Sequence, residues 1–204
     1  MRKIDNSYPI LYIDGMFFNV KENGVFVKKS LYLILAIDWQ GNKKVLGFWI
    51  KNTESASNWL DVFGELKTRG LQDVLIISCD NLSGISQAIE EVFSQTDVQK
   101  CVVQQIRNSL LKVSYKHKKD FVKNMKSIYQ ATNQESAMQN LDELRKNEPK
   151  YPSIIKSWYT NLVELTIFFK YLYELRQAIY TTNSIEPVNK LIRKNRKTNA
   201  EFKV

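Results

Sequence analysis

Residues 8–38 read YPILYIDGMFFNVKENGVFVKKSLYLILAID, and this stretch establishes the class of fold. β-Branched and aromatic residues dominate both sides of a Glu-Asn-Gly turn signal at 22–24, which predicts one strand over 8–20 and another over 25–38. The second is almost continuously apolar from 31 to 37, as expected of a strand buried on both faces. A turn at 39–42 and a third strand over 43–50 complete a predicted antiparallel meander.

Downstream of the meander, the hydrophobic pattern alternates between helix and strand. Residues 53–70 have helical spacing, with Thr53 or Ser55 as cap and Gly70 as terminator. Residues 73–80 form a short apolar run between turn signals, which predicts a buried strand. A helix over 85–93 and a fifth strand over 98–103 follow. This order predicts an α/β fold, a mixed five-stranded sheet with flanking helices.

After residue 104 the strand signal stops and a Lys-rich helical pattern begins. Pro149 and Pro152 interrupt it, and Trp158, Leu162 and Leu165 form part of an apolar stripe. We interpret this stretch as an all-α insertion before the last helix of the core. The predicted organisation is residues 1–104 as the sheet with its first helices, 105–178 as the α-helical insertion, and 179–204 as a helix and basic tail that complete the core.

The net charge and composition of the chain indicate which kind of molecule it binds. The 204 residues carry a formal net charge of +9 with a pI near 9.4, which favours a polyanion, nucleic acid above all. Two cysteines are too few for a disulfide framework, and no apolar run is long enough to span a bilayer. The first residues lack a signal-peptide core, so we expect a cytoplasmic protein without a membrane partner.

Three acids stand at positions where chemistry is expected. Asp14 interrupts the first strand, and Asp80 ends the fourth, where ligand sites of α/β sheets open. Glu186 lies on the late helix. If strands one and four are neighbours, Asp14 and Asp80 approach each other, and three carboxylates that close would repel unless a divalent cation lay between them. The pattern predicts a site for Mg²⁺ or Mn²⁺, with two ions roughly 3.5–4 Å apart acting on a phosphodiester.

Each acid also has a purely structural interpretation. Asp14-Gly15 fits a turn, Asp80-Asn81 fits a strand-end turn or a helix cap, and Asn183 with Glu186 fits a capping box. Singly these signals are weak, whereas the order Asp, Asp, Glu on strand, strand and helix is more specific.

A polar stripe follows Glu186 at helical spacing. Ile185, Val188 and Ile192 would face a core, while an amide and several cations share another face. A carboxylate followed by basic groups suits a metal-bound phosphodiester with its backbone held alongside. The predicted DNA contacts of this segment are Asn189, Lys190, Arg193, Lys194 and Lys197.

Several motifs resemble those of the transposases of the Mutator-like bacterial insertion-sequence family. Residues 8–15 resemble the motif of its first catalytic Asp, and 101–109 (CVVQQIRNS) resemble its Cys-x-x-His-Gln-Ile-Arg-Asn signature. Residues 180–186 (YTTNSIE) resemble the motif that carries its catalytic Glu. The last two motifs are highly specific, and the resemblance covers nearly the whole chain.

The resemblance implies a ribonuclease-H-like fold and DNA transposition by a DDE transposase. Asp14, Asp80 and Glu186 would bind the divalent metal, water would attack a phosphodiester, and the freed 3′-hydroxyl would attack another strand. Arg107, within the second motif, is expected to contact DNA. The implied partners are element ends and target DNA, bound by a homo-oligomer at the bacterial nucleoid.

The chain departs from the family pattern in ways that keep other hypotheses open. Gln104 stands where the motif has His, and Asn81 replaces a Gly after the second Asp. The family's N-terminal region for binding element ends is expected to be absent. A second hypothesis is therefore a truncated, inactive remnant that binds DNA or a full-length partner. A third is another ribonuclease-H-like nuclease, such as a resolvase, against which the 180–186 motif and the helical insertion count.

Overall fold

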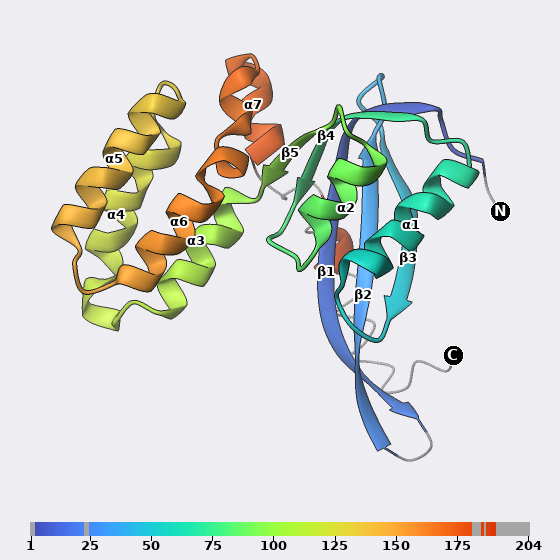
Figure 1. The fold of residues 1–204 in the computed structure, drawn as a ribbon, viewed down its shortest axis with the longest axis horizontal. Helices are drawn as coiled ribbons and strands as arrows, with labels where there is room; N and C mark the ends of the chain where they lie inside the picture. The colour runs from blue at the N-terminus through green and yellow to red at the C-terminus, as the bar shows by residue number, and fades with distance from the viewer. Residues whose placement is uncertain (1–2, 23–24, 181–184, 186, 191–204) are drawn as a thin grey trace. The chain divides into compact units, whose positions relative to one another are not determined.

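The computed structural model describes residues 3–22, 25–180, 185 and 187–190 (Figure 1). Contacts between residues divide the chain into two compact units. Residues 1–98 and 182–204 form the first, here called the sheet unit, and residues 99–181 form the second, the helical unit. The predicted insertion, 105–178, falls within the helical unit, and its boundaries stay a prediction.

A mixed five-stranded sheet forms the centre of the sheet unit, as the sequence predicts. Its strands lie in the order β3-β2-β1-β4-β5. β2 pairs antiparallel with both β1 and β3, while β4 runs parallel to β1. The meander and the α/β class, a mixed five-stranded sheet with flanking helices, are thus confirmed. The strand bounds are β1 Ser7–Glu22, β2 Val25–Ile37, β3 Lys43–Lys51, β4 Asp73–Cys79 and β5 Asp97–Lys100.

β1 runs without interruption through the two residues that resemble a turn. Asp14 pairs with Leu33 and Gly15 with Tyr32 in the register with β2. The turn interpretation of Asp14-Gly15 is therefore wrong, because ladder pairing with β2 holds this stretch in extended backbone. A carboxylate is thereby fixed in the middle of a central strand.

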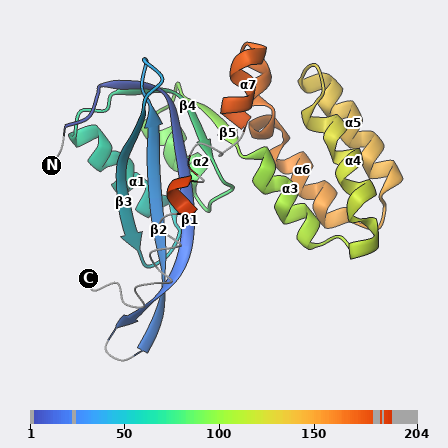
Figure 2. The same ribbon diagram turned by 180° about the vertical axis from the view of Figure 1, so that it is seen from behind.

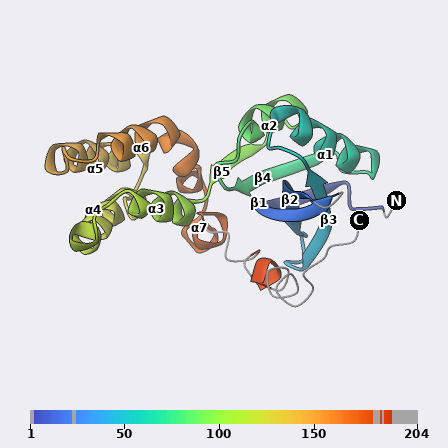
Figure 3. The same cartoon turned by 90° about the horizontal axis from the view of Figure 1, so that it is seen from below.

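The two faces of the sheet are covered differently. Helices α1 (Ala56–Thr68) and α2 (Ile85–Val92) lie on one face, as Figure 3 shows, and bury alternate residues of the strands, including Leu11, Ile13 and Ile34. Intervening positions point the other way because successive strand side chains alternate between faces. Tyr12, Leu33 and Leu35 form a second cluster there with Ile185. The predicted core-facing roles of Ile185 and Val188 are thus confirmed.

The start of helix α1 is set by its N-cap residue, Ser55. The Ser55 hydroxyl accepts a hydrogen bond from the Asn58 backbone N–H (3.3 Å), which satisfies one free donor of the first turn. Of the two predicted caps, Ser55 is therefore the one in use. The helix ends at Thr68, and Gly70 follows with φ of +117°.

The helical unit consists of short helices whose apolar stripes face one another. Trp158, Leu162, Leu165 and Phe168 are all buried, which confirms the predicted stripe. Figure 2 shows α4, α5 and α6 side by side, and contacts join α5 to both neighbours. Pro152 occupies the first turn of α6, where proline is tolerated. The bounds are α3 Val102–Leu111, η1 Tyr115–His117, α4 Lys118–Tyr129, α5 Gln134–Asn147, α6 Pro152–Leu165, η2 Ile167–Lys170 and α7 Tyr173–Tyr180.

The predicted fifth strand over 98–103 is wrong at its C-terminal end. β5 ends at Lys100, and Val102 opens helix α3. Cys101, expected inside a strand, is the N-cap of this helix, and its sulfur accepts a hydrogen bond from the Gln104 backbone N–H (3.4 Å). β-Branched valines favour strands only weakly, so this cap and tertiary packing override the local preference. Among the described residues, no helix combines the length and apolarity needed to cross a bilayer.

Candidate active site

Asp14 is a buried carboxylate on the central strand β1. Its exposed fraction is 8%, and it shares a sheet face with Tyr12, two residues before it. A buried carboxylate is costly unless it is hydrogen-bonded. The side-chain amide of Asn189 meets this requirement by donating a hydrogen bond to Asp14 Oδ2. Asp14 is thus held in place by a residue 175 positions further along the chain.

Asp80 follows the last residue of β4, the strand parallel to β1. Ile13 pairs with Cys79 in that register, so the next residue on each strand is Asp14 and Asp80. The condition set by the sequence, that strands one and four be neighbours, is therefore met. Asp80 is half-buried, and its carbonyl accepts a hydrogen bond from the Leu82 N–H (2.8 Å). The two acids therefore follow a paired position on two neighbouring parallel strands, at the carboxyl end of β4, where ligand sites of α/β sheets commonly open.

Asn189 is fixed from both sides. Residues 187–190 are helical, and the Asn189 backbone N–H donates to the carbonyl of Ile185 (3.1 Å), a residue buried in the second core cluster. Asn189 itself is 5% exposed, and its buried Oδ1 has no hydrogen-bond partner among the residues that the structure describes. The sequence places Asn189 on a DNA-facing stripe, whereas its side chain is turned inward against Asp14. Buried polar atoms are nearly always paired, so an oxygen without a partner beside the Asp14 carboxylate needs an explanation.

The remaining predicted site residues divide between described and undescribed parts of the chain. Lys190 is exposed beside Asn189, and Arg107 lies on the exposed side of α3. Their DNA contacts stay predictions. The residues outside the described part of the structure are Glu186, Arg193, Lys194 and Lys197. Among the residues that are described, no group of three His, Cys, Asp or Glu side chains is arranged to hold a metal ion.

Glu54 is an acid that sequence reasoning missed. It lies between β3 and α1, and a Cβ built on Gly15 would come within 3.1 Å of its Oε1. Burial raises the pKa of the Glu54 carboxyl, a backbone hydrogen bond from Ser83 opposes this, and the Asp14 charge raises it further. Glu54 Oε1 is buried without a hydrogen-bond partner. The sequence shows only a Glu preceding the helix cap Ser55, so nothing local points to Asp14.

The motif position at which Gln replaces His lies in the first turn of α3. The Gln104 backbone N–H is used by the Cys101 cap, and its side chain is partly exposed. The next residue, Gln105, is buried and donates from Nε2 to the Ser157 hydroxyl of α6 (3.0 Å). This helix start is therefore held by α6 independently of the residue at 104.

Comparison with known proteins agrees with the resemblance of the motifs. The family described as "Transposase, Mutator family" matches residues 1–203. The "Transposase for insertion sequence element ISRM3" of Rhizobium meliloti (strain 1021) is 38% identical over 203 residues, 98% of this chain and 51% of that protein. A "Probable transposase for insertion sequence element" of Corynebacterium diphtheriae is 33% identical, over 98% of this chain and 59% of that one.

This chain spans about half the length of these relatives. Among solved structures, a simian T-cell lymphotropic virus intasome in complex with the PP2A regulatory subunit B56 gamma aligns with a TM-score of 0.31 and 14% identity. That alignment covers 59% of this chain and 46% of the other, and a likeness this distant carries no argument. The family match, in contrast, extends over residues 1–203, and it shows that the chain belongs to the Mutator family of transposases.

Proposed function

We propose that this chain carries the catalytic core of a DNA transposase that breaks DNA strands and joins the freed 3′-hydroxyl to a target. The observation that supports this most is the β1–β4 register, in which Ile13 pairs with Cys79, the residues directly before Asp14 and Asp80. Asn189, three residues after Glu186 in sequence, donates a hydrogen bond to Asp14. Relatives named as insertion-sequence transposases support the role.

The donor set suits a hard divalent cation. Asp14, Asp80 and Glu186 would hold Mg²⁺ or Mn²⁺, since carboxylate oxygens are the ligands these ions prefer. The unpartnered Oδ1 of buried Asn189 adds a neutral oxygen near Asp14. When bound, two such ions supply the positive charge that makes water a nucleophile and stabilises a leaving oxygen.

The protein's own side chains would orient the metal-binding acids and position the DNA. Asn189 fixes the Asp14 carboxylate through a donor that never ionises, so the carboxylate keeps its direction before DNA arrives. Lys190 and the basic residues after it would contact phosphates, with Arg107 contributing from the second motif. Assembly as a homo-oligomer on element ends and target, in the bacterial cytoplasm at the nucleoid, belongs to the same proposal.

Metal binding tests the proposal because it does not require the sequence that the longer relatives have beyond the part matched by this chain. Isothermal calorimetry with Mn²⁺ should show binding to the wild-type chain, and Asp14→Ala and Asp80→Ala should each weaken it by at least tenfold. Each variant removes one charged oxygen ligand, and about 1.4 kcal/mol of lost interaction corresponds to that factor.

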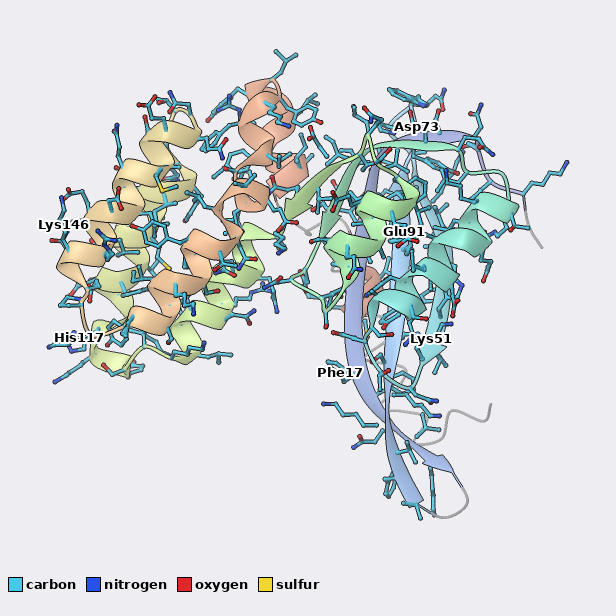
Figure 4. All side chains as sticks on the ribbon, viewed as in Figure 1. Phe17, Lys51, Asp73, Glu91, His117 and Lys146 are labelled. Atoms are coloured by element: carbon cyan, nitrogen blue, oxygen red, sulfur yellow. The ribbon has the colours of Figure 1, made fainter. Side chains whose placement is uncertain are left out.

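Asp73→Ala is the matched control for this titration. Asp73 is an exposed acid at the other end of β4 (Figure 4), so its removal should leave Mn²⁺ affinity unchanged. Supercoiled DNA and Mn²⁺ should then give nicking that Asp80→Ala abolishes while DNA affinity persists. A folded wild-type chain that binds no Mn²⁺, with or without DNA, would remove the basis for a competent enzyme.

The second candidate is a chain that binds DNA without cutting it, which Gln104 in place of the motif His favours. Gln104→His distinguishes the two. If the wild type binds Mn²⁺ and DNA without nicking and Gln104→His nicks, the substitution accounts for the loss. If neither nicks, the defect lies elsewhere in the site.

A further inference from the structure

A pocket of about 320 Å³ lies within the helical unit, at the end where η2 and α7 meet the C-terminal end of α4. Its volume is at the small end of the range for ligand pockets. Five of its lining residues are aromatic and one is a cation. They are Tyr129, Phe168, Phe169, Tyr173, Arg176 and Tyr180.

The aromatic walls are ordered by contacts among themselves. Phe168 packs against Phe169 and Tyr180 with ring centroids 4.3 and 5.0 Å apart. The Arg176 guanidinium lies 5.4 Å from the centre of the Phe169 ring. Phe168 is buried, whereas Tyr173 is 80% exposed at the mouth. The pocket therefore combines a fixed aromatic floor with an accessible ring at its entrance.

Hydrogen bonds fix the backbone of the segments that line the pocket. The buried Gln99 side chain donates to the Leu165 carbonyl (3.0 Å) and accepts from the Phe168 N–H (2.8 Å), which fixes the start of η2. Arg176 donates from Nε to the Tyr171 carbonyl (3.1 Å) and from Nη2 to the Phe169 carbonyl (3.2 Å). A site arranged in advance binds without the cost of ordering its own loops.

The chemistry of the lining selects a flat ring with polar edges. Aromatic faces stack on bases of any sequence, and Arg adds a cation–π contribution. Tyrosine hydroxyls and the amide of Gln130, which also lines the pocket, can pair with a base edge. A purely apolar ligand would leave these polar groups without partners, whereas a nucleobase matches both kinds of surface.

The positive charge of the helical unit indicates that the base belongs to a nucleic acid. Residues 99–181 contain 14 Lys and Arg against 7 Asp and Glu, a net +7 of the chain's +9. A polyanion is therefore drawn to the unit that contains the pocket. Tyr180 also begins the 180–186 motif, so the pocket wall and Glu186 are joined by six residues of chain.

From these features we propose that the pocket receives an unpaired nucleobase of single-stranded DNA, which stacks on its aromatic lining, with Phe169 and Tyr173 as the rings to test. The proposal rests on the proposed function, because transposition exposes unpaired bases near cut ends. It gives the helical unit a task separate from the metal-binding acids, namely to hold the strand by one base.

An oligonucleotide carrying 2-aminopurine tests the pocket directly, because this base loses fluorescence when it stacks. With the wild-type chain and no added metal, fluorescence should fall on binding. Tyr173→Ala should abolish the fall and weaken affinity about tenfold, as expected for one stacked base. Tyr173→Phe keeps the ring and should behave as wild type. Phe169→Ala removes a second aromatic ring of the lining and should also weaken binding.

Tyr115→Ala is the matched control, since Tyr115 is another exposed tyrosine of the same unit (92% exposed) and does not line the pocket. It should leave affinity and quenching unchanged. The proposal that the pocket binds a nucleobase would be wrong if the folded variants Tyr173→Ala and Phe169→Ala both kept wild-type affinity and quenching. Because the fluorescence experiment contains no metal, a negative result would not affect the Mn²⁺ titration that tests the proposed function. A chain that fails to bind Mn²⁺ could, in turn, still be tested for base stacking.

Discussion

At the scale of single residues, Asn189 decides how Asp14 is held. The Asp14 carboxylate is 8% exposed and the Asn189 side chain 5%, so neither relies on water for its hydrogen bonds. The amide donates to Asp14 Oδ2, which stabilises a carboxylate in a position where an unpaired one would be expensive. An Asp at position 189 would instead place a second negative charge there.

Asn189→Ala is expected to lower the free energy of unfolding by about 1–3 kcal/mol, the usual cost of depriving a buried polar group of its partner. Urea denaturation at pH 7 measures the change. Weaker Mn²⁺ binding should accompany it, because Asp14 loses its fixed direction.

Lys190→Ala is the comparison for this variant, because Lys190 is the next residue and is exposed. It should change the unfolding free energy by no more than a few tenths of a kcal/mol. Equal effects of the two substitutions would mean that the hydrogen bond to Asp14 contributes nothing measurable.

At the scale of secondary-structure elements, the loop after β4 positions α2 against α1. Gly84, the N-cap of α2, has φ of +75°, a left-handed conformation that side chains disfavour. A Cβ there would come within 2.8 Å of the Ala56 Cα, at the first residue of α1. The two helices therefore start close together only because position 84 has no side chain. Asp80 and Leu82 lie in the same loop.

Gly84→Ala should destabilise the chain by at least about 2 kcal/mol, since it combines left-handed strain with a collision against backbone. Thermal or urea unfolding followed by circular dichroism checks this value. Gly64→Ala is the control, because Gly64 is exposed within α1 and a Cβ there meets no atom within 4 Å.

That control should gain up to about 1 kcal/mol, the helix-propensity difference between glycine and alanine. If both substitutions changed the free energy of unfolding in the same direction, close packing between the starts of α1 and α2 would not be the reason for glycine at position 84.

At the scale of the whole molecule, charge is divided unevenly between the two units. The helical unit has a net charge of +7, which leaves +2 for the sheet unit that contains Asp14, Asp80 and Glu186. Lys119 and Lys123 lie one turn apart on α4, and both are exposed. Under the proposed function, the metal-binding acids would belong to one unit and most of the attraction for phosphates to the other.

Lys119→Gln together with Lys123→Gln should reduce the slope of log K against log salt concentration by about 2 for duplex DNA, one for each phosphate that a lysine no longer neutralises. Fluorescence anisotropy across a salt series measures it. Lys3→Gln with Lys43→Gln removes two exposed charges from the sheet unit and controls for net charge alone. Identical slopes for the two double variants would show that charge position on α4 does not matter.

The five strands, their succession along the chain and the α/β class of fold could be predicted from the sequence, whereas the order of the strands within the sheet could not. Alternation and helical spacing are local patterns, and the apolar run over 31–37 is enough to mark a central strand. The sequence also indicated Asp14 and Asp80 as a pair, because acids inside or at the end of buried strands are out of place. Where local signals conflicted, as at Val102 and Val103, the pattern failed because a cap and packing outweigh strand propensity.

Which side chains meet became visible only in the folded chain. Asn189 reads as one more residue of a polar stripe until β1 and the 185–190 segment are packed together, 175 residues apart in sequence. Glu54 becomes a neighbour of Gly15 only once α1 lies on the sheet, and the aromatic pocket exists only where α4, η2 and α7 meet. The physical reason is that periodicity specifies which face of an element is buried, whereas the partner of a buried polar or aromatic group is set by the element that packs against it.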